Sequence, residues 1–579
     1  MKLLKKLSWF FKLEKWPYIT GILALSLVSL LNLLPPRVIG EVIDQIASKD
    51  LTNLELAYQL FLLVLSALAM YALRFVWRKY ILGTANRLGR ILRYRLFEHF
   101  TRMSPSFYQT YRTGDLMAHA TNDINAVVGV AGGGVMSAVD ASITALVTVL
   151  TMFFVLDWRL TLIAILPLPF MAWGTSLIGR KNHESFKAAQ EAFSDLNNKV
   201  QESVSGIKVT KSFGYQDAET AAFARINQDV FKKNILAAKY NALFDPMVLI
   251  FVGLSYLLTL IFGGLFISQG RLTVGELVTF ITYLDMLVWP LQAMGYLFNI
   301  SQRGAVSYER IESLLAKESD VTEVASPIKD IKNGRLDYSI QKFAYDDRPT
   351  LRDIRFSIDQ GQTLGIVGVT GSGKTTLLRL LLREQDIQDG NICLAGHDIR
   401  DYRLSTLRSL IGYVPQDQIL FATSIRDNIR FGNPSLSDED VIAVTKLCGI
   451  YEDIMQMPDG FDTLVGERGV SLSGGQKQRL AMCRALILNP EILILDDSLS
   501  AVDAKTEHLI LDNLKRERFG KTTLITAHRL SAVVHADLIL VLDQGRIIES
   551  GSHQELLTQD GWYANTYQNQ QLAESLEEV

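Results

Sequence analysis

The chain has little cysteine and almost no excess of charge, and each shortage excludes a class of protein. Its 579 residues include three cysteines, Cys393, Cys448 and Cys483, and none stands in CxxC spacing. A disulfide framework or a zinc site is therefore not expected, and we interpret the three as buried cytosolic thiols. The formal net charge is −3 and the sequence pI is about 6.3, so the basic excess typical of nucleic-acid-binding proteins is missing.

Long apolar runs are missing from about residue 325 onward, whereas residues 1 to about 305 contain six of them. A mean hydropathy of +0.16 argues against an ordinary soluble enzyme, and 21% charged residues argue against a wholly embedded protein. A membrane-spanning helix needs about 20 mostly apolar residues. Six buried core helices of a soluble domain are the alternative, but no soluble surface is available to cover them. The predicted transmembrane helices are Tyr18–Leu34, Leu60–Val76, Met136–Leu156, Leu160–Ile178, Val248–Ile267 and Leu277–Ile300.

Lysine and arginine are concentrated in the N-terminal segment and in two connections, between the second and third runs and between the fourth and fifth. The other connections are short or acidic. Because cytoplasmic loops carry the basic excess, both termini and the two long connections are predicted to be cytoplasmic. Short external loops and the absence of a sorting signal favour a multi-pass protein of a bacterial inner (plasma) membrane, with an organelle membrane as the alternative.

Three stretches outside the spans have aromatic residues among polar ones. Residues 1–17 are basic and contain Trp9 and Trp16, which predicts an amphipathic helix on the inner leaflet rather than a cleaved signal peptide. The long connections are helically periodic over 85–100 and 188–204, so the membrane helices are expected to continue into the cytosol. Their tips, 106–115 and 206–215, are predicted to dock on the C-terminal domain, since exposed aromatics favour a partner surface. The alternative is that these aromatics fold back on their own helices.

A phosphate-binding loop lies in the C-terminal half. Gly368-Val-Thr-Gly-Ser-Gly-Lys-Thr375 matches G-x-x-x-x-G-K-[ST], follows a predicted strand over 363–367 and opens a predicted helix over 376–382. The glycines let backbone N–H groups approach phosphate oxygens at a helix N-terminus. Lys374 is expected to reach the β- and γ-phosphates, and Thr375 to hold Mg²⁺. The predicted ATP-binding residues of this loop are Gly368, Thr370, Gly371, Ser372, Gly373, Lys374, Thr375 and Thr376.

A second strand, predicted over 491–495, ends in two carboxylates. Asp496 is expected to bind Mg²⁺ directly or through water, and residue 497 stands where a general base would polarise the attacking water. Asp497 is one methylene shorter than glutamate, so its carboxylate should lie about 1 Å short of the water. A misplacement of that size lowers a rate by on the order of 10²-fold.

Between these motifs, Leu472-Ser-Gly-Gly-Gln476 precedes a helical pattern over 477–488. A Ser-Gly-Gly turn before a helix presents N–H groups and a hydroxyl to an anion. Beside the two nucleotide motifs, in this order, it resembles the signature of the ATP-binding cassette (ABC) family. The resemblance implies that Ser473, Gly474, Gly475 and Gln476 contact an ATP molecule bound to a second cassette.

Other positions match the family one by one. Tyr345 matches the aromatic that stacks on adenine, and Gln416 matches the glutamine that senses the γ-phosphate and Mg²⁺ and contacts the tips of the membrane domain. Asp503 matches the aspartate of the D loop, and His528 matches the switch histidine that touches the γ-phosphate. Residues 466–469 resemble an exporter-specific segment that contacts the transmembrane domain.

The resemblance covers nearly the whole chain and implies its architecture. An α-helical transmembrane domain of six helices with long cytosolic extensions is followed by an α/β P-loop cassette. The expected boundaries are an N-terminal segment 1–17, a transmembrane domain 18–315, a linker 316–334 and a nucleotide-binding domain 335–579. A chain of this kind is similar to an ATP-driven exporter, an ATPase that uses ATP and Mg²⁺ and lies in the lipid bilayer.

One cassette completes no ATP site in this family, because each ATP lies between one cassette's phosphate loop and the other's signature. The chain thus resembles a half-transporter that needs a second ABC subunit. Since the usual glutamate is replaced by Asp497, it is similar to the impaired-site subunit of heterodimeric multidrug exporters. The alternative is a slow homodimer, because Gln416 and His528 are retained.

The cargo is predicted less sharply. Two acidic residues in the spans, Asp140 and Asp285, should avoid lipid and face the bundle or a wet cavity. With the aromatic and methionine residues of the sixth span they favour small cationic amphiphiles, exported as drugs; alternatively these residues serve hydrogen bonding and helix packing. A lipid or peptide exporter or flippase is the second candidate, and a membrane-bound ATPase regulator or channel the third. Importers are disfavoured because membrane and cassette domains are fused. The predicted cavity residues are Asp140, Phe280, Tyr283, Asp285, Met286 and Trp289, with Met294 nearby.

Overall fold

The computed structural model describes residues 2–330, 333–345, 348–466 and 472–577. Contacts divide the chain into two compact units. The helical unit comprises Met1–Thr101 and Thr113–Lys317, and the cassette unit comprises Arg102–Arg112 and Glu318–Val579. The boundary after Lys317 falls inside the predicted linker, and the short segment 102–112 joins the cassette although it lies between two helical stretches.

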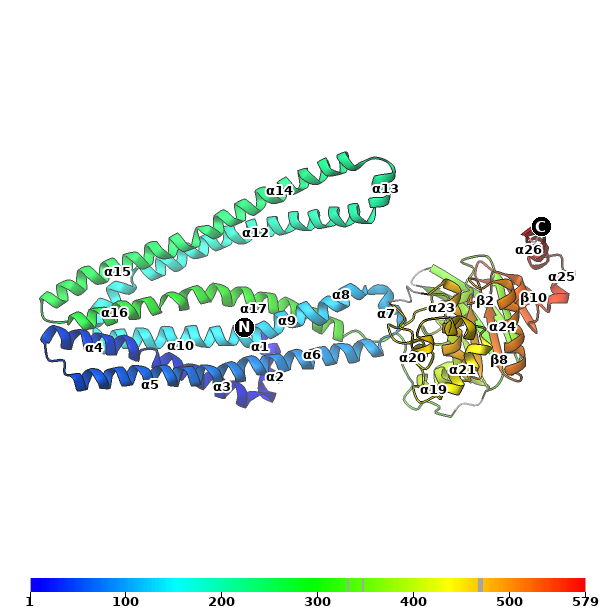
Figure 1. Cartoon of the computed structure of the whole chain (residues 1–579), viewed down its shortest axis with the longest axis horizontal. Coiled ribbons are helices and arrows are strands. Elements are labelled where there is room, and N and C mark those ends of the chain that lie inside the picture. The colour runs from blue at the N-terminus through cyan, green and yellow to red at the C-terminus, as the bar shows by residue number, and fades with distance from the viewer. Residues whose placement is uncertain (1, 331–332, 346–347, 467–471, 578–579) are drawn as a thin grey trace. The chain divides into compact units, whose positions relative to one another are not determined.

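Among the described residues, six helical stretches of the helical unit are long and apolar enough to cross a membrane, which confirms the predicted six helices (Figure 1). Each runs well beyond the apolar core predicted for it, to between 34 and 53 residues. The stretches are Lys15–Ser48, Asn53–Arg102, Thr113–Leu156, Trp158–Ser205, Gln216–Ser268 and Val274–Leu315.

Most stretches are built from successive helices joined by one-turn π-helical segments or short breaks. The first is interrupted where the sequence predicted one run to Leu34: α3 ends at Leu31, and α4 begins at Leu34 with proline in its first turn. Proline fits a first turn because its missing N–H has no partner there in any case. In chain order the elements are α3 (Lys15–Leu31), α4 (Leu34–Ser48), α5 (Asn53–Trp77), α6 (Gly83–Arg102), α8 (Thr113–Ala118), α9 (Ile124–Gly129), α10 (Val135–Thr151), α11 (Trp158–Ile165), α12 (Pro167–Ser205), α14 (Gln216–Ala242), α15 (Phe244–Ser268), α16 (Val274–Met286) and α17 (Val288–Leu315).

The N-terminal segment forms two short helices, α1 (Lys2–Lys6) and α2 (Ser8–Leu13). Leu3, Leu7 and Phe10 form its buried face. Trp9 of this segment contacts α17 of the same unit, because its Nε1 donates to the Tyr308 hydroxyl at 3.3 Å. The exposed side contains Leu13 and Trp16 among its lysines, and binding of this side to the inner leaflet stays a prediction.

The two tips that are predicted to be cytoplasmic form short helices, α7 (Pro105–Thr110) and α13 (Ile207–Ser212). Helix α7 belongs to the cassette unit, where the Ser106 hydroxyl donates to Asp320 and Phe107 is buried. Docking of the first tip on the C-terminal domain is thereby confirmed for residues 102–112. Helix α13 belongs to the helical unit, with Phe213 and Tyr215 exposed after it, and docking of the second tip stays a prediction.

The cassette is built on two sheets. An antiparallel sheet has the order β2 (Arg348–Ile358), β1 (Leu336–Tyr345), β4 (Asp389–Leu394), β5 (His397–Asp398). The second has the order β10 (Arg546–Gly551), β9 (Leu538–Asp543), β3 (Thr363–Gly368), β8 (Thr522–Thr526), β7 (Ile492–Asp496), β6 (Ile411–Val414). Strands β9 to β6 of this second sheet pair in parallel. Ligands of such sheets bind beyond the carboxyl ends of the strands.

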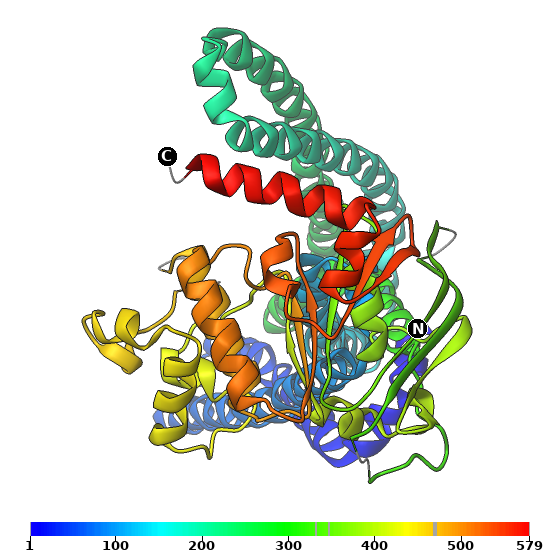
Figure 2. The same ribbon diagram turned by 90° about the vertical axis from the view of Figure 1, so that its right-hand side faces the viewer.

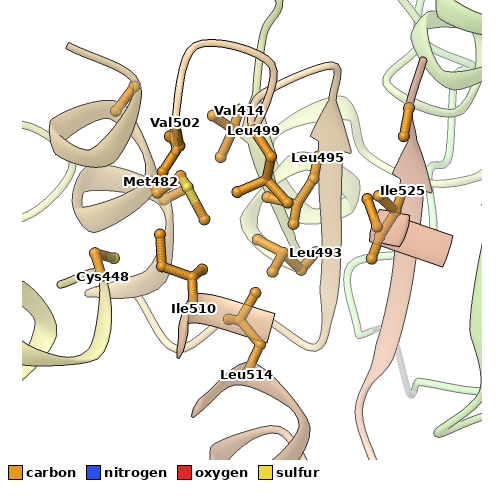
Figure 3. Packing of buried hydrophobic residues seen from close by; sticks show 14 of the residues in the cluster. Val414, Cys448, Met482, Leu493, Leu495, Leu499, Val502, Ile510, Leu514 and Ile525 are labelled. Atoms are coloured by element: carbon orange, nitrogen blue, oxygen red, sulfur yellow. The ribbon is translucent and has the colours of Figure 1, made fainter. Parts of the chain in front are cut away.

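Helices cover the parallel sheet and bury its strands. All five residues of β7 are buried, as expected for a strand with helices on both faces. Figure 3 shows Leu493 and Leu495 of β7 packed with Met482, Ile510 and Leu514 from the covering helices. In chain order, the helices of the cassette after β3 are α18 (Lys374–Leu381), α19 (Leu404–Ser409), α20 (Ile425–Ile429), α21 (Asp438–Leu447), α22 (Tyr451–Met455), α23 (Gly474–Leu486), α24 (Ala504–Glu517), α25 (His553–Thr558) and α26 (Trp562–Glu577).

The three thiols are free, and two of them contribute to the core. Cys448 and Cys483 are fully buried in the cluster of Figure 3, and the Cys483 thiol donates to the Val444 carbonyl at 3.6 Å. Burial raises the pKa of Cys483 well above its ordinary value. The prediction of buried thiols is confirmed for this pair, whereas Cys393 is half-buried at the end of β4.

Candidate functional site

The phosphate-binding loop joins β3 to α18 at the carboxyl edge of the parallel sheet. Gly368 has a φ of +142°, and a Cβ there would lie 2.0 Å from the Leu542 carbonyl oxygen of β9. Gly373, the N-cap of α18, has a φ of +103°. Both positions require glycine, and the sharp return they allow presents the loop's N–H groups at the start of the helix.

Lys374 lies inside this loop and is 8% exposed. Its ammonium donates to the carbonyls of Gly368 at 2.8 Å and Val369 at 3.0 Å. Burial lowers the pKa of Lys374, and the negative charges of Asp497 and Asp496 oppose that shift. Ser372 Oγ, also buried, has no hydrogen-bond partner in the described part of the chain. A buried cation and a free hydroxyl in one glycine loop are the donors that a phosphate group needs.

Asp496 ends β7 and is 1% exposed. Its Oδ1 accepts hydrogen bonds from Thr375 Oγ1 at 2.9 Å and from Thr526 Oγ1 at 2.8 Å. The Tyr413 hydroxyl donates to Oδ2 at 3.3 Å, and burial raises the pKa of that tyrosine. The fold thus brings together the two side chains, Thr375 and Asp496, that the sequence predicts as Mg²⁺ ligands.

Asp497 follows immediately and has a left-handed backbone, with a φ of +47°. Aspartate tolerates this region better than most residues. Its N–H donates to the Thr526 carbonyl at 3.1 Å, which joins the ends of β7 and β8. On the side chain, Gln416 Nε2 donates to Oδ2 at 3.5 Å, a long hydrogen bond. Burial raises the pKa of Asp497, and a charge interaction with His528 opposes the increase.

The three predicted catalytic residues therefore lie together. Asp497 and His528 line one small hollow, together with Ser500 of the D loop (residues 500–503), and Gln416 contacts Asp497. They come from three neighbouring strand ends, β6, β7 and β8. The order β8-β7-β6 places these ends side by side, although Gln416 and His528 are 112 positions apart in the chain.

The signature turn, Ser473–Gln476, starts α23 with a reciprocal cap. Ser473 Oγ accepts from the Gln476 N–H at 3.2 Å, and Gln476 Oε1 accepts from the Ser473 N–H at 3.1 Å. The capped turn needs no residue from a second chain to form. It places its N–H groups and the Ser473 hydroxyl at the start of a thirteen-residue helix. Glu467 to Gly469, the core of the predicted exporter-specific segment, lie outside the described residues.

Gln478 joins the signature helix to the D loop, and sequence reasoning missed it. The residue is 4% exposed; its Nε2 donates to Ser500 Oγ at 3.2 Å, and its Oε1 accepts from the Ala501 N–H at 3.0 Å. Asp503, predicted to contact nucleotide, caps α24 by accepting from the Thr506 N–H at 3.0 Å. That backbone hydrogen bond lowers the pKa of Asp503. No spacing pattern in the sequence links Gln478 to the D loop, 22 residues further along the chain.

Tyr345 lies at the end of β1, half-buried and edge-on to Phe343 with ring centroids 5.1 Å apart. It lines a small pocket with Arg379 and Glu384 of the cassette and with α7. Burial raises the pKa of Glu384, and Arg379, whose Nε lies 3.8 Å from that carboxylate, opposes the shift. Tyr345 is thus placed beside the docked tip as well as near the phosphate loop's helix.

The predicted cargo residues separate into two groups. Phe280 and Tyr283 are 0% and 1% exposed, and the Tyr283 hydroxyl donates to the Leu33 carbonyl at 2.7 Å. The prediction that these two face a cavity is wrong for this structure, because the 3.6-residue period turns them into the apolar core between helices. The remaining candidates are Asp140, Asp285, Met286 and Trp289; the side chain of Met294 lies outside the described residues.

These remaining residues have polar surroundings. Asp285 is exposed and accepts from the Tyr256 hydroxyl of α15 at 3.1 Å. Trp289 is 51% exposed, and it lies near Asp140, which is half-buried. Two carboxylates with an aromatic ring between helices can contact a cationic amphiphile, and the same contacts also join the helices.

Known proteins match the chain over its whole length. The family profile described as "ABC transporter transmembrane region" matches residues 18–291, and that described as "ABC transporter" matches residues 351–500. A "Probable multidrug resistance ABC transporter ATP-binding/permease protein" of Bacillus subtilis is 44% identical, covering 98% of both chains. A "Multidrug resistance-like ATP-binding protein" of Escherichia coli is 41% identical, covering 100% of this chain and 98% of the relative.

A flippase and a solved exporter are also similar. An "ATP-dependent lipid A-core flippase" of Syntrophus aciditrophicus is 34% identical, covering 84% of this chain and 80% of the relative. The solved structure of "a bacterial Atm1-family ABC exporter with ATP bound" superposes with a TM-score of 0.81 at 28% identity, covering 96% of this chain and 99% of that one. With six membrane helices and a nucleotide-binding cassette in one polypeptide, the chain belongs to the ABC transporter family, as an exporter whose ATPase domain drives transport across a membrane.

Proposed function

We propose that the chain is one half of a heterodimeric multidrug exporter and carries its impaired ATP site. The observation that carries this proposal is Asp497, which stands beside Gln416 and His528 in the place of the usual glutamate. Its carboxylate ends about 1 Å short of the water it would have to polarise, on a backbone fixed by strand pairing. The signature turn has its complete cap, so this chain can still complete an ATP site on its partner.

The phosphate loop is proposed to bind ATP with Lys374 on the β- and γ-phosphates and Ser372 Oγ as a further donor. Tyr345 stacks on adenine, and Thr376 continues the loop into α18. The residues that would hold Mg²⁺ are Thr375, Asp496 and Gln416, whose oxygens are the hard donors this ion prefers. The ion supplies positive charge to the phosphate oxygens during hydrolysis. His528 contacts the γ-phosphate, and the partner's signature and D loop close the site from the other side.

Motion is proposed to pass from the cassettes to the membrane helices through the tips. Helix α7 is fixed to the cassette by its Ser106–Asp320 hydrogen bond and by buried Phe107, so it must follow the cassette when ATP binds. The exposed aromatics after α13 are proposed to dock on a cassette as well. Closure of the two cassettes then turns the cavity from the inner to the outer side, with both termini in the cytoplasm of an inner (plasma) membrane.

Small amphiphilic drugs are the proposed cargo. The relatives of 44% and 41% identity are both named for multidrug resistance. Exposed Asp285 and Trp289 and half-buried Asp140 offer charge and an aromatic face to a cation. A lipid flippase is the second candidate, favoured by the 34% identical relative named for that activity.

Reconstituted transport tests the proposal. The chain is purified with the subunit that co-purifies from its native host and inserted in liposomes, and ATP hydrolysis is measured with cationic drugs, lipids or peptides added. Drugs are expected to stimulate hydrolysis, and Lys374→Met is expected to weaken ATP binding to this chain by about 10- to 100-fold, the range of a charged hydrogen bond. A preparation that contains copies of this chain alone and hydrolyses ATP at a full rate would contradict the heterodimer. Stimulation by lipids but by none of the drugs would favour the flippase.

A further inference from the structure

The C-terminal helix contacts the loop that carries His528. Gln570 of α26 accepts a hydrogen bond from the Leu530 N–H at 2.8 Å and donates one to the His528 carbonyl at 2.9 Å. One side-chain amide thereby satisfies both backbone groups that flank Arg529. The amide hydrogen-bonds to this backbone as a neighbouring β-strand would. It therefore fixes the backbone on both sides of residue 529. The loop from Thr526 to Leu530 is called the switch loop below.

Helix α26 is itself firmly anchored at its start. Tyr563 is fully buried, its hydroxyl lies 2.7 Å from His553 Nδ1, and its N–H donates to Glu549 at 3.1 Å. The spacing 563, 567, 570 follows the helical repeat, so Gln570 lies on the same face as buried Tyr563 and half-buried Tyr567. Helix α26 is drawn red in Figure 2. Its start is anchored to the cassette, and Gln570 lies on the anchored face of the helix.

The other side of the switch loop is joined to the D loop. Arg529 donates to the Val502 carbonyl at 3.3 Å and to Glu507 at 3.4 Å, and Ser531 Oγ donates to Glu507 at 3.0 Å. Glu507 is 2% exposed, and these two hydrogen bonds satisfy its carboxylate. The backbone around residue 529 is held from both sides, by Gln570 and by the Glu507 network, and His528 is the next residue.

We propose that Gln570 is a positioning residue, which sets the His528 ring for the γ-phosphate from the C-terminal helix. This inference rests on the proposed role of His528 at this chain's ATP site. Without the amide, the switch loop keeps its fold through β8 and the Glu507 network, but its backbone at residues 528–530 loses two hydrogen bonds. The ring then spends less time in contact with the γ-phosphate, while the rest of the nucleotide is bound as before.

The test compares ATP with ADP, which lacks the γ-phosphate. Affinities of this chain for both nucleotides are measured on the full transporter by photoaffinity labelling, with the subunits separated by mass. Gln570→Leu is expected to lower the affinity for ATP about fivefold and to leave that for ADP unchanged. The matched control is Gln568→Leu on the same helix, because Gln568 is exposed and its side chain makes no hydrogen bond in the part of the chain that the structure describes.

A double-mutant cycle with His528→Ala separates positioning from a general loss of stability. If Gln570 acts through His528, Gln570→Leu causes no further loss of ATP affinity in the His528→Ala background. Equal losses for ATP and ADP, or losses that add in the double variant, would overturn the inference. If His528→Ala alone lowers ATP affinity and Gln570→Leu does not, the inference fails and the role of His528 stands. If His528→Ala has no effect, that proposed role fails and the inference fails with it.

Hydrogen exchange gives a direct reading of the contact. The Leu530 amide is bonded to Gln570, so Gln570→Leu is expected to speed exchange in the peptide that covers residues 527–533. Gln568→Leu should leave the rate of this peptide unchanged. Unchanged exchange in Gln570→Leu would overturn the inference even if nucleotide affinities changed.

Discussion

The cassette and the helical unit bury polar groups in different ways. In the cassette, charged side chains such as Asp496 and Glu507 are 1% and 2% exposed, and each accepts two or more side-chain hydrogen bonds from other parts of the chain. In the helical unit, most buried polar residues have hydroxyl side chains, and several of these bond to a carbonyl one turn back in their own helix, as Thr259 does to the Ser255 carbonyl at 2.8 Å. Phosphate chemistry requires charge at fixed positions, whereas hydrocarbon penalises it. The difference explains why sequence motifs identify the residues proposed for the ATP site, whereas no motif identifies those proposed for the cargo site.

Lengthening the carboxylate at position 497 is the change with the largest expected effect on the cassette side. Asp497→Glu should raise ATP hydrolysis at this chain's site by about 10²-fold, because it restores the reach of the base. Single-turnover hydrolysis is measured with the partner's own site inactivated. Asp497→Asn is the control and should show no gain. Equal rates for aspartate and glutamate would mean that the short base suffices.

In the helical unit, the largest expected effect is a smaller one, a change in the affinity for cargo. Asp285→Asn should weaken binding of a cationic amphiphile by up to about fivefold, the value of an exposed ion pair, and leave a neutral analogue unaffected. The amide still accepts the hydrogen bond from Tyr256, so the helix contact is retained. Drug-stimulated ATPase titrations of the two compounds give the ratio. Asp285→Glu is the charge-retaining control; a loss for both compounds would favour a structural role.

The unfolding temperature tests the same difference between the two regions. The cassette holds a functional carboxylate where its burial lowers the stability of the fold. Burial raises the pKa of Asp497, so its ionised form destabilises the fold above that pKa. Asp497→Asn should raise the unfolding temperature at pH 7 by about 1–3 °C. The gain should shrink as the pH falls, because aspartate is then protonated in the folded cassette. A lower unfolding temperature, or a gain independent of pH, would contradict this sign.

Thiol labelling gives the smallest expected change. Cys448 and Cys483 are fully buried, and Cys393 is half-buried, so a thiol reagent should label Cys393 alone in the folded protein. Modification is followed by mass before and after denaturation. ATPase activity should be unaffected by the first label, since Cys393 lies on β4 of the antiparallel sheet, away from the parallel sheet's carboxyl edge. Rapid labelling of Cys483 would contradict the packing of the core.

The sequence predicted the elements whose chemistry depends on spacing. Glycine at residues 368 and 373, Lys374, and the carboxylates after an apolar strand identify the phosphate loop and its companion strand, and the structure joins Thr375 to Asp496 as expected. Hydropathy predicted the six helices because hydrocarbon thickness imposes a length on them.

Other features depend on contacts between residues that are far apart in the sequence. The spacing of residue types along the chain does not predict such contacts. Residue type alone predicts that Phe280 and Tyr283 face a cavity, but which helix face is buried depends on the neighbouring helices. Gln478 and Gln570 contact loops 22 and 42 residues away in the chain, and a single glutamine has no pattern that reveals such a partner. The segment 102–112 joins the cassette across more than 200 residues for the same reason.

Hydrolysis by the assembled transporter after removal of the Asp497 carboxylate tests the central claim, that the two ATP sites are unequal, most directly. Asp497→Ala is compared with the same change at the partner's general base, and steady-state ATP turnover is measured in liposomes. We predict that Asp497→Ala leaves most of the turnover intact, while the partner's change abolishes it. Loss of all turnover with Asp497→Ala would contradict the account.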